Sequence, residues 1–412
     1  MDQRKDERRY YGLDALRGFM MMLGIVLHAA LLYLSSPPPA IPMPTDRNHS
    51  VVFDLIFDFI HDFRMPAFFV LAGFFTSLLV EKRGVQGTLK NRASRILLPL
   101  LAALVLILPP TVLLMSDFML SVRFGTHDLI PNLDQLKILG DEVAAQTGQP
   151  AGRPPIAHLW FLYYLCMFYL LLAPLRWLVE KSRRFKAALA RLLAQPTAMI
   201  VFSLWTALTL WPFKGGQVHE GFVYFAPHPP SLLYYGTFFV LGFGFHTHRA
   251  FLDTAARHVW TMAALAVALF PLSTALSVLD NNARGGSAEL HAYSVLANGL
   301  CTWALIYFFI GAALRFFDRP SPWIEYTSQS SYWVFLVHLP LVSLAGWWLV
   351  QYDLPAIVKF LLVCSFTAVI AFLTFHYWVQ RTWISRFLHG RRFDLPWPWN
   401  KPDINAAAAR PG

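Results

Sequence analysis

Long apolar stretches recur along the chain, separated by shorter segments rich in charged residues, proline or glycine. Because a bilayer core of about 30 Å requires about 20 apolar residues per helical span, each stretch is a candidate for crossing a membrane. Such runs are too long and too continuously apolar for the strands of a membrane barrel. The pattern therefore predicts an all-α, polytopic integral membrane protein with about ten transmembrane helices. The predicted spans cover residues 12–34, 59–80, 96–115, 158–178, 197–213, 232–247, 259–279, 292–314, 332–350 and 356–379.

The composition argues against a soluble globular protein, because 56% of the 412 residues are hydrophobic and only 14% are charged. A net charge of +10 is also found in nucleic-acid-binding proteins, so its distribution matters. With the N-terminus in the cytoplasm, most of the 34 lysines and arginines fall on the inner side, as the positive-inside rule requires. The charge therefore indicates topology. The expected partner is a lipid bilayer and not nucleic acid, and both termini are expected in the cytoplasm.

Three segments are expected along the chain. Residues 1–11 form a cytoplasmic N-terminal segment, 12–390 a transmembrane domain, and 391–412 a cytoplasmic tail, poorly ordered because it is rich in proline and then alanine. The first apolar run is too long for a signal peptide and no small-residue cleavage site follows it, so it is expected to remain as a helix. All three cysteines fall within predicted spans, which predicts neither a disulfide framework nor a metal site.

Besides Asp14 near its start, the first predicted span carries Arg17 and His28. Eleven positions on a helix correspond to three turns plus about 20°, so both residues share one face and are separated by roughly 16 Å. Ionisable residues are costly in lipid and usually line a cavity. The structural alternative is an Arg17 that snorkels and pairs with Asp14, and a His28 that only bonds a neighbouring helix.

The second predicted span begins with a ladder of polar residues in "FDLIFDFIHDFRMPAFFVLAGFF". The ladder consists of Asp54, Asp58, His61, Asp62 and Arg64. It forms either a self-paired network at the mouth of the helix or one wall of a polar cavity that faces His28, in which a carboxylate orients His61. A kink at Pro66 would help to open such a cavity.

Further candidates lie at the ends of later spans. Arg92 and Arg95 are one turn apart at the cytoplasmic start of the third span, where they either bind phosphate oxygens or act only as positive-inside anchors. His158 and Trp160 enter the fourth span from outside, as site residues or as part of an interfacial aromatic belt. His338 lies about two turns into the ninth span, where it is either a core residue or a site residue.

Four of these motifs occur in an order that resembles the integral-membrane acyltransferase family 3. They are Arg17 with His28 after ten intervening residues, Arg92-x-x-Arg95, "HLWFL" at the fourth span and "SYWVFLVH" near the end, and they cover the chain from about residue 10 to 380. The run "DFIHDFRMPAFFVLAGFF" is most similar to a branch of that family associated with succinylation of osmoregulated periplasmic glucans.

The resemblance implies acyl transfer from cytoplasmic acyl-CoA, succinyl-CoA or acetyl-CoA, to a saccharide hydroxyl on the outer side of a bacterial inner membrane. His28 matches the essential histidine of the family, Arg17 its partner arginine, and Arg92 with Arg95 the pair assigned to donor handling. No permanently bound cofactor and no metal are expected.

The chemistry of the residues agrees with this reaction. A saccharide hydroxyl is a poor nucleophile, and a histidine can take its proton during attack on a thioester, so His28 is the candidate base. His61 and Asp62 are the further catalytic candidates. Arg64 would bind the free carboxylate of a succinyl donor, unless it pairs with Asp62 or Asp58. The remaining substrate-binding candidates are His158, Trp160 and His338.

Two other functions are compatible with the sequence. The first is acetyl transfer to a different envelope polysaccharide. The second is a transporter or flippase of a polar saccharide, in which the same charges line a substrate pathway.

Overall fold

The structure is a computed structural model that describes residues 10–38, 45–128, 131–147, 156–174, 191–192, 195, 197–219, 225–283 and 286–400. In these residues the chain forms helices and no strands. The helices are α1 (Tyr11–Leu31), α2 (Val51–Arg92), α3 (Leu98–Leu106), α4 (Leu108–Phe124), α5 (Leu133–Thr147), α6 (Trp160–Leu170), α9 (Ala198–Leu210), α10 (Pro229–Thr247), α11 (Ala250–Arg257), α12 (Val259–Asn282), α13 (Ala288–Phe316), α14 (Pro322–Leu349), α15 (Ala356–Thr374) and α16 (Trp383–His389). Short π-helical or 3₁₀ turns cover Ala93–Leu97, Ala157–Leu159, Lys214–Gly216 and Phe375–Val379.

The all-α membrane architecture is confirmed, but about ten spans are not. Six helices of the described residues are long and apolar enough to cross a bilayer: Tyr11–Leu31, Val51–Leu106, Val259–Asn282, Ala288–Phe316, Pro322–Leu349 and Ala356–Val379. The predicted second span and the first half of the third belong to one helical run, Val51–Leu106, which is interrupted at Gly84 with φ 67° and ψ 174°. The second half of the third predicted span continues into α4. Two other predicted spans contain shorter apolar helices, Ala157–Leu170 and Ala198–Leu210. Parts of the fourth predicted span and of the N-terminal segment lie outside the described residues, and the orientation of both termini stays a prediction.

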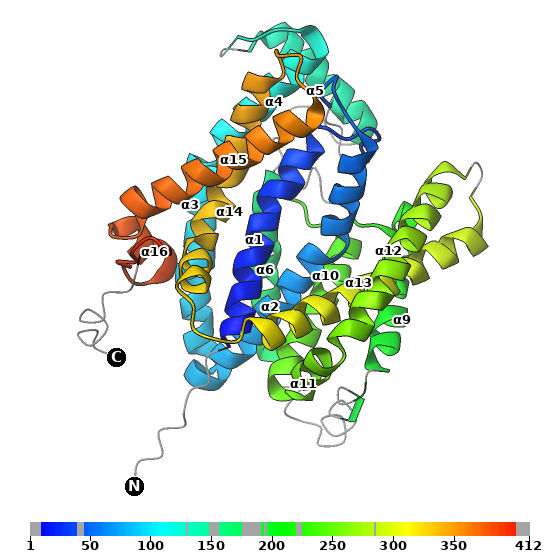
Figure 1. Cartoon of the computed structure of the whole chain (residues 1–412), viewed down its shortest axis with the longest axis vertical. Helices are drawn as coiled ribbons and strands as arrows, with labels where there is room; N and C mark the ends of the chain where they lie inside the picture. Colours follow the sequence, from blue (N-terminus) through cyan, green and yellow to red (C-terminus); the bar gives the residue numbers. More distant parts are fainter. Residues whose placement is uncertain are drawn as a thin grey trace.

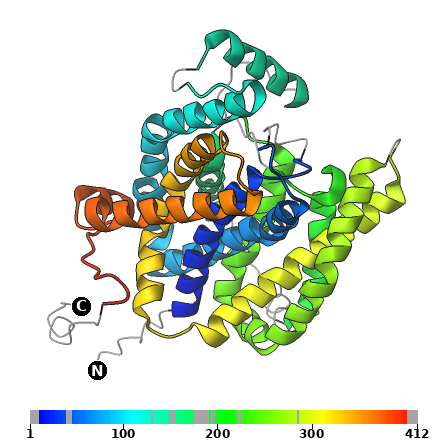
Figure 2. The same cartoon turned by 45° about the horizontal axis from the view of Figure 1, so that its top comes forward.

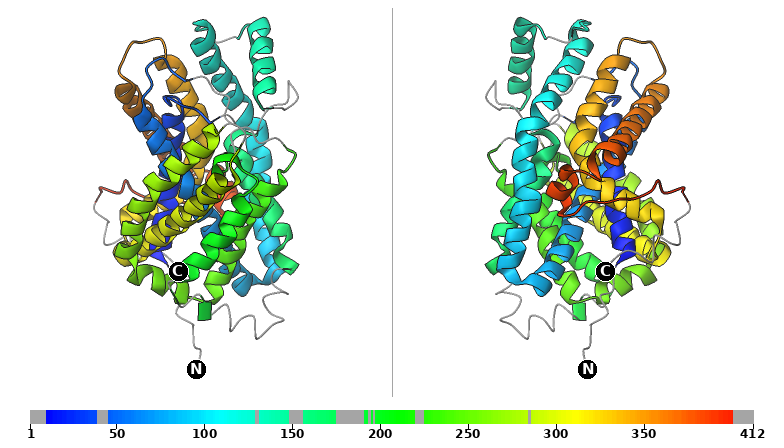
Figure 3. Two further views of the ribbon diagram at one scale, coloured as in Figure 1. Left: turned by 90° about the vertical axis from the view of Figure 1, so that its right-hand side faces the viewer. Right: turned by 90° about the vertical axis from the view of Figure 1, so that its left-hand side faces the viewer.

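Helix α1 lies in the centre of the molecule (Figure 1). It packs against α2, α13, α14 and α15. In Figure 1, α14, α15 and α16 lie on its left, α9, α12 and α13 on its right, and α5 at the top. The turned view shows α15 crossing α14 (Figure 2), and the side views show α3 and α4 running along one edge (Figure 3). Helix α1 contains only a few polar residues, yet four other helices pack around it. Its surroundings are therefore largely protein.

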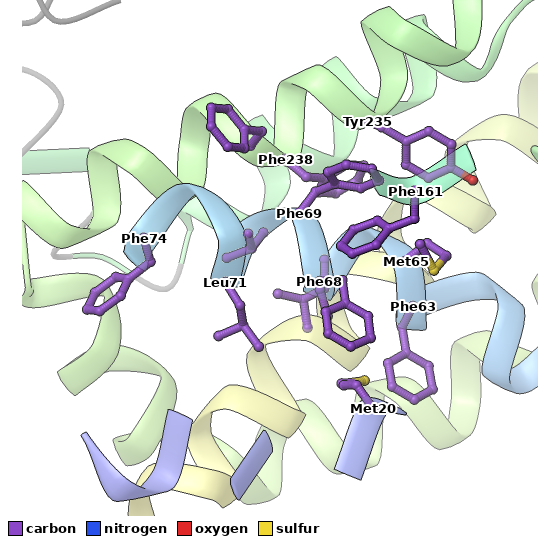
Figure 4. Packing of buried hydrophobic residues seen from close by; sticks show 14 of the residues in the cluster. Met20, Phe63, Met65, Phe68, Phe69, Leu71, Phe74, Phe161, Tyr235 and Phe238 are labelled. Carbon is purple, nitrogen blue, oxygen red and sulfur yellow. The ribbon is translucent and has the colours of Figure 1, made fainter. Parts of the chain in front are cut away.

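The largest hydrophobic core forms around α2. Figure 4 shows aromatic side chains of α2 pointing toward α1 and α10, and all the labelled residues are buried. Two glycines bring α2 and α10 into backbone contact: a methyl group on Gly73 would meet the carbonyl oxygen of Phe239, and one on Gly242 would meet that of Val70. Small residues allow such close approach of helices in membranes. The part of α2 that follows the polar ladder is thus packed tightly against α10.

Pro66 does not interrupt α2, in which the only non-helical residue is Gly84. Since proline has no N–H, the carbonyl four residues earlier, at Asp62, has no helical donor. The hydroxyl of Thr302 in α13 donates to this carbonyl at 3.1 Å. A neighbouring helix therefore supplies the hydrogen bond that Pro66 removes.

A buried ion pair attaches the segment after α1 to α15. The ammonium of Lys359 lies 2.7 Å from a carboxylate oxygen of Asp46, and the two side chains are 0% and 1% exposed. Asp46 also accepts a hydrogen bond from the backbone N–H of Asn48 at 2.9 Å. Lys359, which falls inside a predicted span, is thus fully compensated.

The C-terminal segment differs from the sequence expectation of poor order over 391–412. Both ends of the Gln380 side-chain amide bond the backbone of Leu395, at 3.0 and 3.3 Å, and the N–H of Phe393 donates to the Gln380 carbonyl at 2.7 Å. Phe393 and Leu395 are buried against Tyr326 and Val379. The proline-rich composition of this segment did not indicate that it docks, because its backbone hydrogen bonds are made to a single residue outside it, Gln380. Residues 401–412 lie outside the described part of the chain.

Candidate active site

A cavity of about 90 Å³ lies between α1, α2, α4, α14 and the start of α6, large enough for several water molecules. Four imidazoles and one guanidinium line it: His28, His61, His158, His338 and Arg64. The other lining residues are mostly apolar and include Trp160 and Phe161. The structure therefore brings together, from four separate parts of the sequence, most of the ionisable residues that the sequence singled out within the membrane. The cavity predicted to face His28 is present, with His61 and Arg64 in its wall, but no aspartate of the ladder lines it.

His28 and His338 stack inside this cavity. Their ring centroids are 5.0 Å apart with an angle of 28° between the planes. The Nδ1 of His338 lies 2.8 Å from the carbonyl oxygen of Phe335, which can only accept, so Nδ1 carries the proton and Nε2 of the neutral ring has a lone pair. Nε2 of His338 and Nδ1 of His28 are buried without a hydrogen-bond partner among the described residues. Two imidazole nitrogens are therefore available for a substrate.

His158 is held by a carbonyl that a proline makes available. Pro340 in α14 has no N–H, so the carbonyl of Leu336 lacks its helical donor. Nε2 of His158 donates to this carbonyl at 3.2 Å, and its ring meets His338 edge-on with centroids 5.1 Å apart. Both His158 and Trp160 are less than 9% exposed, which contradicts the alternative of an interfacial aromatic belt.

Arg64 is a buried cation without an ionic partner among the described residues. Its side chain is 5% exposed, its Nε donates to the carbonyl of Met20 at 2.8 Å, and its guanidinium lies 5.9 Å from the ring centroid of Phe68. No carboxylate oxygen of the described residues lies within 4.0 Å of it. The expected alternative, pairing with Asp62 or Asp58, is therefore not observed in the described chain.

His61 is oriented by a backbone carbonyl and not by a carboxylate. Its Nε2 donates to the carbonyl of Val218 at 2.6 Å, and its ring stacks on Phe57 and His219 with centroids 5.1 and 4.8 Å away. Burial, and then the neighbouring His61, lower the pKa of His219 well below its ordinary value. His61 therefore has one fixed nitrogen, and a neutral imidazole covers one of its faces.

Asp62 faces a second, smaller pocket on the other side of α2. This pocket is also lined by His61, Gln217, Tyr234 and Asn298. One oxygen of Asp62 accepts a hydrogen bond from Gln217 at 3.3 Å, and the other is buried without a partner in the described chain. Asp62 does not line the histidine cavity, so any effect on it passes through neighbouring residues.

Sequence reasoning missed the segment between α9 and α10, which contributes Gln217, Val218 and His219. Its glycine pair was the available signal, because Gly215 and Gly216 adopt φ of 71° and 64°, which other residues rarely tolerate. The N–H of Gly215 donates to Asp280 at 2.9 Å and its carbonyl accepts from Ser294 at 2.8 Å. The turn is thus clamped onto α12 and α13, and it presents the next residues to α2.

Arg17 does not line the cavity. One guanidinium nitrogen donates to the hydroxyl of Ser328 at 2.6 Å and lies 3.5 Å from a carboxylate oxygen of Asp14, as the pairing alternative predicts. Arg17 therefore belongs to a separate polar group at the start of α1.

Arg92 and Arg95 do not act as a fork in the structure. A π-helical turn over Ala93–Leu97 lies between α2 and α3, and its wider turn separates residues that share a face in an α-helix. Arg92 reaches Thr76 at 3.3 Å and lies 5.4 Å from the ring centroid of Tyr169. Arg95 instead donates to the carbonyls at the end of α16, those of Arg386 and Phe387, at 2.6 and 2.9 Å.

His389, at the end of α16, joins this second polar group. Burial lowers its pKa to about 4, and the guanidinium groups of Arg17, Arg391 and Arg95 act in the same direction. Both ring nitrogens are buried without a partner among the described residues. We call Arg17, Arg95 and His389 the basic group.

Comparison with known proteins decides the family. The model of a family described as "acyltransferase domain" matches residues 10–376. The chain belongs to this acyltransferase family. It is 28% identical over 362 residues to glucans biosynthesis protein C of Escherichia coli O139:H28 (strain E24377A / ETEC), covering 82% of this chain and 83% of the relative. Identity and coverage are the same for the protein of that name in Escherichia coli K12. No solved structure matches.

In this membrane acyltransferase the residues predicted from sequence divide into two groups. The cavity collects His28, His61, Arg64, His158, Trp160 and His338. Arg17, Arg92 and Arg95 lie outside its lining, and Asp62 lines the second pocket. The candidate residues for acyl transfer therefore lie in two places. One is the histidine cavity, and the other is the polar group near the start of α1 and the end of α16.

Proposed function

We propose that this acyltransferase moves a succinyl group from cytoplasmic acyl-CoA to a hydroxyl of a periplasmic glucan or another cell-surface saccharide, in a bacterial inner membrane. The observation that carries the proposal is the stacked pair of His28 and His338 at a buried cavity, with two nitrogens that have no hydrogen-bond partner among the described residues. The name of these relatives, glucans biosynthesis protein C, supports the choice of a glucan as acceptor.

In the proposed reaction His28 is the base. Its Nδ1 takes the proton of the acceptor hydroxyl while the oxygen attacks the thioester carbonyl, forming a C–O bond. The C–S bond then breaks, and the proton goes to the leaving thiolate to give free CoA. His338 lies beside His28 and holds the reacting group, together with His158 and Trp160. His61 and Asp62 are further catalytic candidates, His61 from the wall of the cavity and Asp62 through the second pocket.

The donor would enter from the end of the molecule that carries the basic group. Arg17 lies roughly 16 Å along α1 from His28, a separation suited to a pantetheine arm with its thioester at the cavity. Arg17, Arg92 and Arg95 would hold the phosphates by charge-assisted hydrogen bonds. Arg95 gives one nitrogen to α16, which leaves its other N–H groups for the donor.

The test uses purified protein with succinyl-CoA and a periplasmic glucan, measuring thiol release and the mass of the glucan. His28→Ala should abolish transfer while the protein still folds and inserts. The matched control is His49→Ala, because His49 is exposed, lies outside the cavity and bonds only Ser35 at 3.1 Å. Transfer that persists in His28→Ala would remove His28 as the base, and no transfer by the unchanged protein would overturn the proposed function.

A further inference from the structure

The positive charge of Arg64 is buried, and no carboxylate of the described chain pairs with it. A buried charge is strongly unfavourable unless it is paired, and buried arginines usually have a carboxylate partner. Two of the three aspartates of the same helix are engaged elsewhere: Asp54 accepts the N–H groups of Ser35 and Ser36, and Asp62 accepts an N–H of Gln217. The third, Asp58, has no carboxylate oxygen within 4.0 Å of the guanidinium. Within the described chain the positive charge of the guanidinium is therefore not neutralised by any carboxylate.

The guanidinium is fixed in one position. Its Nε is bound to the Met20 carbonyl, and Nη1 lies 3.7 Å from the sulfur of Met65. Nη2 makes no hydrogen bond within the described chain. It lies against Gly24, and a methyl group placed on Gly24 would meet it and would lie 3.6 Å from Nε2 of His338. The free edge of Arg64 thus lies beside His338, on the wall of the cavity that also contains His28.

We propose that Arg64 binds the free carboxylate of the transferred acyl group, so that the enzyme selects the monothioester of a dicarboxylic acid over a monocarboxylic acyl donor. This inference rests on the proposed function. A carboxylate is a planar anion whose two oxygens match the guanidinium fork, and its binding would compensate the buried charge. An acyl chain with that carboxylate at Arg64 would place its other end in the same cavity as His28.

A different role for the same residue makes a different prediction. If Arg64 stabilised the oxyanion of the tetrahedral intermediate, it would act on every acyl donor equally. If it bound the distal carboxylate, it would act only on donors that carry one. The ratio of kcat/KM for two donors therefore separates the two roles.

The experiment compares succinyl-CoA with butyryl-CoA, whose acyl chain has the same number of carbons and no carboxylate. The unchanged protein should prefer succinyl-CoA by about tenfold to a hundredfold, the range for a buried charged hydrogen bond. Arg64→Gln should remove this preference by lowering kcat/KM for succinyl-CoA alone. Arg64→Lys should retain part of it, because lysine keeps the charge without the fork. The control is Arg123→Gln, since Arg123 is exposed and pairs with Glu142.

Gly24→Ala provides a second variant. It retains Arg64, but the added methyl group would push the Nη2 atom of the guanidinium aside. It should also lower the preference for succinyl-CoA. Equal use of both donors by the unchanged protein overturns the inference whether or not the variants fold. An equal loss for both donors in Arg64→Gln overturns it in favour of the oxyanion role. If the unchanged protein transfers neither acyl group to the saccharide, the proposed function itself fails.

Discussion

The Nε2 atom of His158 lies 3.2 Å from the carbonyl oxygen of Leu336, which Pro340 leaves without a helical donor. A residue at the start of α6 is therefore positioned by a missing N–H in α14. The contact decides which ring nitrogen carries the proton, because a carbonyl only accepts. Nδ1 of His158 is left with a lone pair and is buried without a partner in the described chain.

Pro340→Ala should restore a helical N–H to the Leu336 carbonyl and compete with His158. We expect kcat to fall by about tenfold to a hundredfold, the cost of a misplaced group at a reacting centre, while thermal stability is retained. The control is Pro271→Ala, which also removes a proline from a helix interior, in α12. Unchanged kcat in Pro340→Ala would show that the orientation of His158 does not matter for turnover.

The pH dependence of stability should report His389. Its folded-state pKa of about 4 lies below the ordinary value of 6.5, so the unfolded state binds the proton first as the pH falls. Between pH 7 and pH 5 this should lower the unfolding free energy by about 1 kcal/mol, after allowance for solvent screening. Above pH 7 the residue should have no effect.

His389→Gln should make the melting temperature in detergent less sensitive to acid over the same interval. His127→Gln is the control, because His127 is exposed. An identical drop in melting temperature for His389→Gln and the unchanged protein would contradict the prediction.

Lys359→Met should destabilise the protein by about 3 to 5 kcal/mol, because it leaves the carboxylate of Asp46 buried without its cation. The matched control is Arg47→Met. Arg47 pairs with Asp353 at 3.9 Å with both side chains exposed, and such pairs contribute at most about 1 kcal/mol. Thermal unfolding in detergent measures the loss of stability in both variants. Equal losses would contradict the prediction, because burial of the pair would then not determine its contribution to stability.

Ionisable residues within the predicted spans indicated where a cavity would form, whereas the helical spacing that placed Arg17 and His28 on one face did not predict that Arg17 lies outside it. His28, His61 and Arg64 were singled out as ionisable residues in lipid, and they line one cavity. The same reasoning failed for Arg92 and Arg95, because a π-helical turn changes the helical spacing on which the pairing depended. Gln217 and Val218 were not predicted, since their contacts to α2 depend on a turn that distant helices hold in place.

The docking of residues 391–400 had no signal in composition. It depends on the side chain of Gln380 and on aromatic burial against Tyr326. Its consequence for the site is direct, because α16 precedes this segment and supplies His389 beside Arg95.

The two prolines within α2 and α14 have a consequence for biogenesis. A helix entering the bilayer alone would expose a bare carbonyl to hydrocarbon at Asp62 or Leu336, and only Thr302 or His158 from a later or earlier segment removes that cost. For Pro66 the donor belongs to α13, which is synthesised after α2, whereas for Pro340 the donor precedes α14 in the chain. A chain in which α2 fails to pack on α13, or α14 on the turn before α6, would leave one of these carbonyls without a hydrogen bond, so the two prolines favour correct assembly of the cavity walls over misassembly.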